Sequence, residues 1–235
     1  MRTRVARVRS SFETVLFSVL AVVAVLAIAL RMPAPPLPVQ VAALGVLVAT
    51  LGLPHGALDP LIARRAGLWH TPLGFAGFNL GYIAMVAVVV GVWLLAPTAS
   101  LIGFLLVSGI HFGADWNVGR SVVLRSLTGV GLLTLPAFAH HDEVAGIYRT
   151  LAGTGGTVVA DVQSWLGPVA IVAMLLGAAF ALHRRPTDAL EILLAATLAF
   201  VAPPLVFFVL YFCALHSARH LRHGFAEERG GGRLA

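Results

Sequence analysis

The chain has 235 residues, of which 59% are hydrophobic and 11% charged. This composition excludes an ordinary soluble domain and predicts an all-α polytopic protein of the cytoplasmic membrane. The formal charge of +6 does not indicate nucleic-acid binding, because the arginines fall in predicted loops and near both termini, as the positive-inside rule expects.

The N-terminal segment is basic and is followed by an apolar run. Residues 1–11 carry four arginines, and residues 12–30 are almost wholly apolar. Residues 27–29 resemble a signal-peptide cleavage site. The apolar run is long for a signal peptide, so we predict a retained first span that begins in the cytoplasm.

Further apolar segments follow, bounded by prolines or arginines. The longest loop between them, residues 140–162, contains histidines, acids and glycines, and we place it outside the membrane. With the first one, the predicted spans up to this point cover residues 12–30, 39–63, 72–96, 101–116, 122–138 and 164–182.

Residues 188–223 are too long for one span. As a single helix they would extend about 54 Å, whereas a bilayer core is about 30 Å thick. Pro203 and Pro204 interrupt the segment, and proline disfavours helix in the residue before it. We predict a hairpin of two spans, residues 189–202 and 205–223. The result is about eight spans in one domain, residues 12–223, with a cytoplasmic tail over residues 224–235.

Histidines recur in three of these spans with a spacing of four. His216 and His220 share one helix face, because residues four apart lie one above the other. Two other spans have a histidine followed four residues later by an aspartate. In the eight-span topology all three spans run inward, and His55 lies about 13 Å along its helix from Arg64. The candidate metal ligands are His55, His111, His216 and His220, and the candidate supporting carboxylates are Asp59 and Asp115.

An ionisable residue inside the membrane indicates a functional site, and four imidazoles at one depth indicate a metal ion. Four histidines suit Fe(II), zinc or copper. Zinc would normally close a tetrahedral site, whereas octahedral iron keeps two positions for other ligands. Asp59 and Asp115 would orient the ligand rings. The alternatives are that both aspartates end their spans at lipid headgroups, or that both bind a di-iron site.

Three motifs contain these histidines: Pro54-His55-Gly56-Ala57-Leu58-Asp59, His111-Phe112-Gly113-Ala114-Asp115 and Tyr211-Phe212, the last followed by His216-Ser217-Ala218-Arg219-His220. In this order they resemble the Brp/Blh family of membrane β-carotene 15,15′-dioxygenases of bacteria and archaea. The resemblance covers residues 52–223 and departs from the family at Pro60, where a further histidine is expected. It implies Fe(II) held by His55, His111, His216 and His220, with dioxygen and β-carotene as substrates. It also implies retinal as the product, made for rhodopsins.

Two other classes of membrane protein use histidines in helices. A bis-histidine haem protein would need one histidine pair and would be coloured. A metal transporter would use all four histidines, but it also needs a polar path through the outer half of the membrane, which the sequence does not provide.

Overall fold

The computed structural model describes residues 11–52, 60, 63–64, 66–119 and 121–222, and all the regular structure in them is helical. Five of these helices are long and apolar enough to cross a membrane, or up to six if the bent pair α8–α9 counts as one span. The all-α prediction is therefore confirmed, while the described helices do not by themselves reach the predicted eight spans.

The helices are α1 (Phe12–Ala29), α2 (Leu37–Leu47), α5 (Pro72–Leu95), α6 (Pro97–Phe112), α7 (Val122–Ala139), α8 (His141–Trp165), α9 (Gly167–Leu182), α10 (Pro186–Val201) and α11 (Pro204–Tyr211), with the short turns η1 (Val48–Gly52), η2 (Gly113–Asp115) and η3 (Phe212–Ser217).

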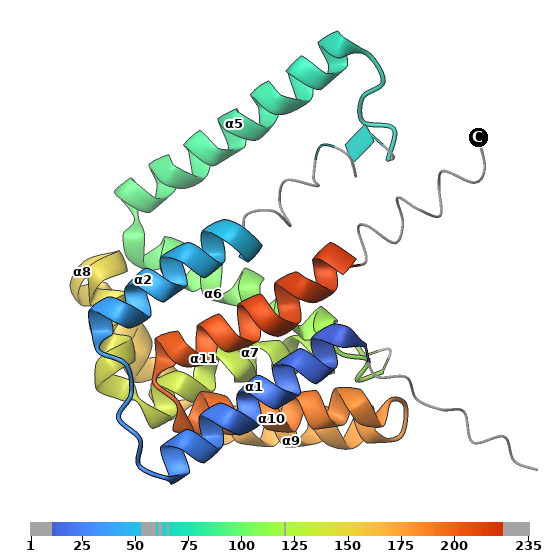
Figure 1. Cartoon of the computed structure of the whole chain (residues 1–235). Coiled ribbons are helices and arrows are strands. Elements are labelled where there is room, and N and C mark those ends of the chain that lie inside the picture. Colours follow the sequence, from blue (N-terminus) through green and yellow to red (C-terminus); the bar gives the residue numbers. More distant parts are fainter. Residues whose placement is uncertain (1–10, 53–59, 61–62, 65, 120, 223–235) are drawn as a thin grey trace, which may run out of the picture.

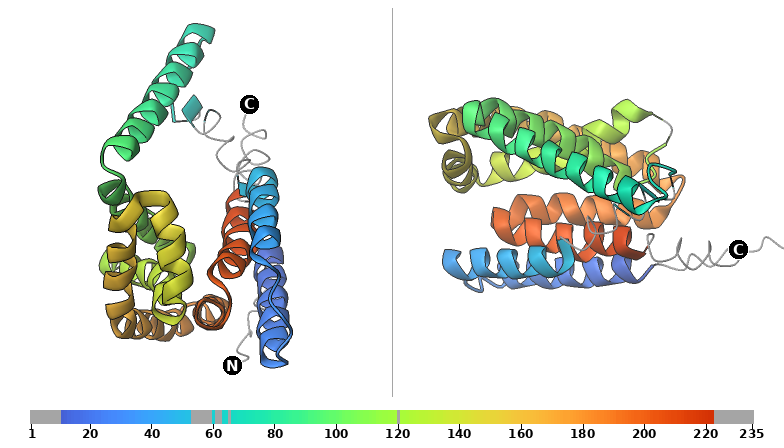
Figure 2. Two further views of the ribbon diagram at one scale, coloured as in Figure 1. Left: turned by 90° about the vertical axis from the view of Figure 1, so that its left-hand side faces the viewer. Right: turned by 90° about the horizontal axis from the view of Figure 1, so that it is seen from above.

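Helix α7 lies at the centre of the molecule and packs against α6, α8, α9 and α10. Helices α1, α2 and α11 lie together beside this group, and α5 stands away from the other helices (Figures 1 and 2). The main apolar core joins α1, α7, α10 and α11 through Phe17, Leu132, Ile192 and Tyr211, all of which are buried. By contrast, no residue of α5 is buried.

Glycines bring α6 and α7 into close contact. A β-carbon at Gly129 of α7 would collide with the carbonyl oxygen of Gly109 and with the backbone of Gly113. Glycine therefore allows the two helix backbones to touch, as small residues do in membrane bundles. This contact lies within one turn of His111 and fixes the end of α6 against α7.

The predicted break at Pro203 and Pro204 is confirmed. Helix α10 ends at Val201, Ala202 takes an extended conformation, and Pro204 is the first residue of α11. Proline suits this first position because its missing N–H would have no helical partner there. Helix α10 has 16 residues, fewer than the about 20 residues that a straight span needs.

Residues 140–162, predicted as a loop with a turn at the glycines 153–156, form two helical arms joined by that turn. They make up most of α8, which reverses direction at Ala152 and Gly153, where the glycine has a φ of 62°. His141 Nε2 lies 2.7 Å from Asp161 Oδ1 across this reversal, although a straight helix would separate the two residues by about 30 Å. Gly156 packs directly on the carbonyl of Tyr148. The loop prediction is therefore wrong for the residues that flank the turn, which are helical.

Candidate metal centre

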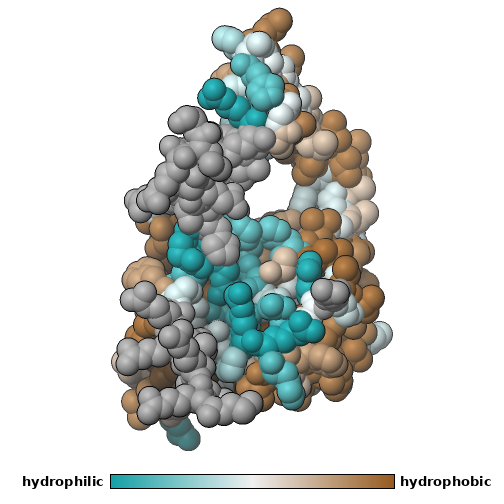
Figure 3. Space-filling view, turned by 90° about the vertical axis from the view of Figure 1, so that its right-hand side faces the viewer, coloured by the Kyte–Doolittle hydropathy of each residue, from teal (hydrophilic) through white to brown (hydrophobic). Residues whose placement is uncertain are grey.

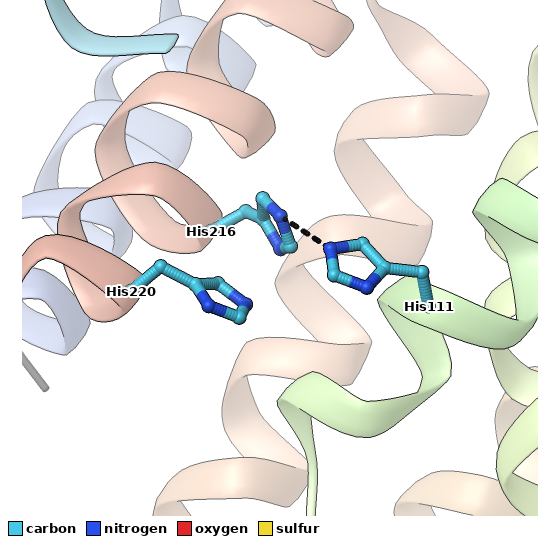
Figure 4. A group of neighbouring side chains, drawn as sticks. All are labelled: His111, His216 and His220. Carbon is cyan, nitrogen blue, oxygen red and sulfur yellow. Dashed lines mark hydrogen bonds between the residues drawn. The ribbon is translucent and has the colours of Figure 1, made fainter. Parts of the chain in front are cut away.

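Three of the four predicted histidine ligands lie together at the same end of two helices. His111 is in the last turn of α6, His216 is in η3, and His220 follows one turn later. Each of them offers one ring nitrogen, and these three nitrogens all lie within 4.8 Å of one another. Figure 4 shows the three rings turned toward one another from opposite helices. The spacing of four between His216 and His220 thus has the predicted effect of placing both on one face.

The nearest pair of ring nitrogens has a separation typical of metal ligands. His111 Nε2 lies 3.2 Å from His216 Nε2. Two nitrogens at this distance either share one proton or bind one cation. Two imidazoles at right angles on one metal ion, each with a bond of about 2.1 Å, would have their nitrogens about 3 Å apart. The donor set therefore fits a divalent metal ion of the kind that imidazoles bind.

Asp115 sets the orientation of His216. The Nδ1–H of His216 donates to the Asp115 carboxylate, 2.9 Å from Oδ2 and 3.1 Å from Oδ1. The proton is assigned to Nδ1 because a carboxylate only accepts. This leaves the Nε2 lone pair directed at His111, which is the usual arrangement of a carboxylate behind a metal-binding histidine. The predicted supporting role of Asp115 thus has a geometric basis, in a side chain that is 2% exposed.

A tyrosine completes the surroundings of this carboxylate. The hydroxyl of Tyr211, which is fully buried, donates to Asp115 Oδ2 at 2.6 Å. Phe212–Ser217 forms a π-helical turn, a feature that often marks functional sites. Tyr211 and His216 lie at the two ends of this turn, and both reach the same aspartate.

The histidines lie between an apolar and a polar cavity. The apolar pocket has a volume of about 280 Å³, and its walls include Phe104, Ser108, His111, Phe208, Phe212 and His216. The polar cavity has a volume of about 570 Å³, and its walls include Glu13, Asp115, Asp188, Arg219 and His220. Hydrophilic side chains gather on this end of the molecule, bordered by hydrophobic ones (Figure 3). The centre is therefore open to an apolar ligand on one side and to small polar species on the other.

His55 and Asp59 lie outside the described residues, so the structure does not place the fourth predicted ligand or the second predicted carboxylate. The sequence reasoning missed a buried polar network behind the histidines. Arg219, which the charge pattern assigned to the cytoplasmic side, donates to the main-chain oxygen of Asp115 at 2.6 Å and to Glu191 at 2.7 and 2.8 Å. Arg222 binds Glu13 in the same region, with a closest distance of 2.6 Å. The available signal was the presence of Glu13 and Glu191 inside apolar segments.

Known proteins are similar to this chain over most of its length. A family model described as beta-carotene 15,15'-dioxygenase matches residues 46–234. A beta-carotene 15,15'-dioxygenase of an uncultured marine bacterium is 32% identical over 193 residues, which cover 74% of this chain and 66% of that protein. A probable beta-carotene 15,15'-dioxygenase Blh of Halobacterium salinarum is 26% identical over 207 residues, which cover 75% of this chain and 59% of that protein.

The chain thus spans slightly less than two thirds of the length of these curated relatives. No solved structure matches it. The family model, however, covers well over half of the chain and includes the three described histidines. The chain therefore belongs to the beta-carotene 15,15'-dioxygenase family.

Proposed function

We propose that this protein is a membrane-embedded non-haem iron dioxygenase that cleaves β-carotene at its central 15,15′ double bond. The observation that carries the proposal is the cluster of His111, His216 and His220 beside an apolar pocket. Membership of the family and the names of the two relatives support the choice of reaction and substrate.

The residues that would hold Fe²⁺ are the three clustered histidines, together with His55. Neutral imidazoles suit ferrous iron, and Asp115 keeps one of them in the required tautomer. When bound, iron would supply the activation of dioxygen. We assign Asp59 a supporting role toward one of the ligand rings, because it follows His55 at the spacing at which Asp115 follows His111; Asp115 itself orients His216, on another helix.

The substrate side of the centre is the apolar pocket. Its aromatic walls, formed by Phe104, Phe208 and Phe212, offer surface to a flat polyene and exclude water, which protects reactive species from hydrolysis. A carotenoid dissolved in the bilayer would reach this pocket sideways. Cleavage replaces one carbon–carbon double bond by two carbonyl groups, so the two oxygen atoms of one O₂ account for two aldehydes. From β-carotene these are two molecules of retinal, available to a rhodopsin.

The membrane placement that fits this function has about eight spans and both termini in the cytoplasm. The five or six candidate spans among the described helices support a multi-pass protein. The arginines after residues 63, 182 and 218 support this orientation by the positive-inside rule. In this arrangement residues 12–223 form one domain in the cell membrane, and all four histidines lie in its cytoplasmic half.

The test is expression in bacteria that make β-carotene. The wild-type protein is expected to remove the pigment and produce retinal, and His111→Ala is expected to abolish both effects while still inserting in the membrane, because alanine is compatible with a helix. Full retinal production by His111→Ala would refute the proposal. An absorption spectrum and a metal assay on the purified protein separate the alternatives: a Soret band would indicate a haem protein, and metal uptake into vesicles without carotene cleavage would indicate a transporter.

A further inference from the structure

Glu191 is a buried carboxylate that the proposed chemistry does not use. It lies in α10 and is fully buried within the bundle. An ionisable group in such a position is costly and indicates a functional role. Its carboxylate accepts hydrogen bonds from Thr14 Oγ1 at 2.6 Å, from Trp116 Nε1 at 3.1 Å and from the Arg219 guanidinium at 2.7 and 2.8 Å. It therefore holds together segments that are far apart in the sequence.

Two of these partners lead directly to Asp115. Trp116 is the next residue along the chain. Arg219 uses its NH2 group for Glu191 and its NH1 group for the main-chain oxygen of Asp115, at 2.6 Å. The guanidinium group is planar and rigid, so when Arg219 binds both partners, the position of Glu191 fixes the position of the Asp115 main chain.

Arg219 also links the two helices that supply the metal ligands. It lies one turn after His216, and the oxygen that it binds belongs to η2, which directly follows the turn with His111. Asp115 then closes a loop of contacts by accepting the proton of His216 Nδ1. The distance between the two ligand-bearing helices therefore depends on the Glu191–Arg219 pair.

We propose that Glu191 and Arg219 are positioning residues of the metal centre, which fix Asp115 and, through it, the ring of His216. The inference rests on the proposed function, since it requires that the histidines bind a metal ion. A purely structural ion pair would stabilise the bundle without influencing that ion. The two roles differ in what they do to metal affinity and to the ligand field.

Glu13 provides a matched control. It is also a buried carboxylate, 1% exposed, and it binds Arg222 at 2.6 Å at the same end of the bundle. It forms only a long ion pair with Arg219, at 3.9 Å, which is beyond hydrogen-bond distance. Glu13→Gln therefore removes a similar buried charge while leaving in place the hydrogen bonds that Arg219 makes to Glu191 and to Asp115.

The experiment titrates Co²⁺ into metal-free, detergent-purified full-length protein and follows the visible absorption bands of the bound ion. Glu191→Gln is expected to weaken Co²⁺ binding by about tenfold or more, as loss of an outer-shell partner does, and to shift the bands. Glu191→Asp, which keeps the charge, is expected to recover part of the affinity. Glu13→Gln is expected to lower the melting temperature but to leave affinity within about twofold and the bands unchanged.

Equal affinity and identical bands in Glu191→Gln and Glu13→Gln would overturn the inference and leave the proposed function intact. A wild-type protein that binds no Co²⁺ would overturn the metal centre itself, and the inference with it. If Glu191→Gln does not accumulate in membranes, Trp116→Phe and Thr14→Val replace it, since each removes one hydrogen bond to Glu191. Only Trp116 adjoins Asp115, so weaker Co²⁺ binding in Trp116→Phe than in Thr14→Val supports the inference, and equal binding overturns it.

Discussion

Replacing Asp115 with asparagine tests the hydrogen bond that orients the central histidine. The aspartate accepts donors from two side chains, His216 Nδ1 and the Tyr211 hydroxyl. Asparagine has the same shape but presents one oxygen and one NH₂ group. If its oxygen occupies the Oδ2 position, it still accepts from His216 Nδ1 and from Tyr211, but its NH₂ group lies where Oδ1 is now, 3.1 Å from His216 Nδ1. The bond to the ring then loses its charge and has a second donor beside it, so the ring is held less firmly in the orientation and tautomer that a metal ion needs.

The expected loss of metal affinity in Asp115→Asn follows from the role of its hydrogen bond to His216. Changes to the partners of ligand histidines typically lower metal affinity 10–100-fold, equivalent to about 1.4–2.8 kcal/mol. We expect Asp115→Asn near the upper end, about 100-fold, for two reasons. The bond to His216 loses its charge, and charge-assisted bonds are about twice as strong as neutral ones. The side chain is also almost fully buried, so water does not compensate for the acceptor oxygen that becomes an NH₂ group.

The assay measures iron content after dialysis against a graded chelator, together with retinal formation by the iron-loaded protein. Asp188→Asn is the matched control, because Asp188 lines the same polar cavity, but its carboxylate accepts the main-chain N–H of Asn117 at 2.8 Å. It should retain wild-type iron affinity. Wild-type iron affinity and turnover in Asp115→Asn would show that the aspartate does not orient a metal ligand.

The other predictions concern the pocket, the helix contact and the topology. Ser108→Leu, which fills part of the apolar pocket, should lower the rate of β-carotene cleavage by about tenfold or more with unchanged iron content; unchanged cleavage would mean that the polyene binds elsewhere. Gly129→Ala should lower the free energy of unfolding by about 1–3 kcal/mol through overpacking, and it should weaken iron retention by displacing α6. The control is Gly77→Ala on α5, where a β-carbon meets nothing within 4 Å; it should change neither thermal unfolding nor iron content. A cytoplasm-dependent reporter fused after Ala235 should be active and an exterior-dependent one silent; the reverse result would contradict the cytoplasmic placement of the C-terminus and of the histidine cluster that precedes it.

Sequence reasoning found most of the helices because their signals are local. Long apolar runs ending at arginine or proline predicted α1, α5, α7 and α9 to within a few residues. The break before Pro204 was predictable for the same reason, since the steric effect of proline acts on its immediate neighbours.

The hairpin in α8 was not predictable in this way. Its glycines and polar residues are typical of a loop, and the hydropathy pattern does not indicate that the residues on each side of Gly153 are helical. The contact that closes it, His141 with Asp161, joins residues 20 apart. Such a pairing depends on how tightly the turn at Gly153 reverses the chain, and this is a property of the packed structure.

For the metal centre, the histidine spacing was sufficient to predict the described cluster, whereas the residues that hold the histidines and Asp115 in place could not be predicted from the sequence. A tyrosine in an apolar run normally packs, and the bond of Tyr211 to Asp115 joins residues 96 apart. The charge pattern predicts Arg219 on the cytoplasmic side, because its carboxylate partner Glu191 lies on a different helix and does not show in the local sequence.

The distribution of charge around the cluster is itself an argument for a bound cation. Among the described residues, the two buried glutamates, Glu13 and Glu191, each form an ion pair with an arginine. Asp115 differs from them, because Arg219 binds its main-chain oxygen, and the hydrogen bonds to its carboxylate come from Tyr211 and His216. A buried carboxylate whose partners are neutral is costly; besides Tyr211, the partners of Asp115 are His216 and, at 3.9 Å, His220, which are neutral when they bind a metal ion. A divalent ion among the histidines would supply the compensating positive charge, and that charge would itself be stabilised by the aspartate. Asp188, which is also buried, accepts the main-chain N–H of Asn117, whereas the carboxylate of Asp115 binds a histidine of the centre.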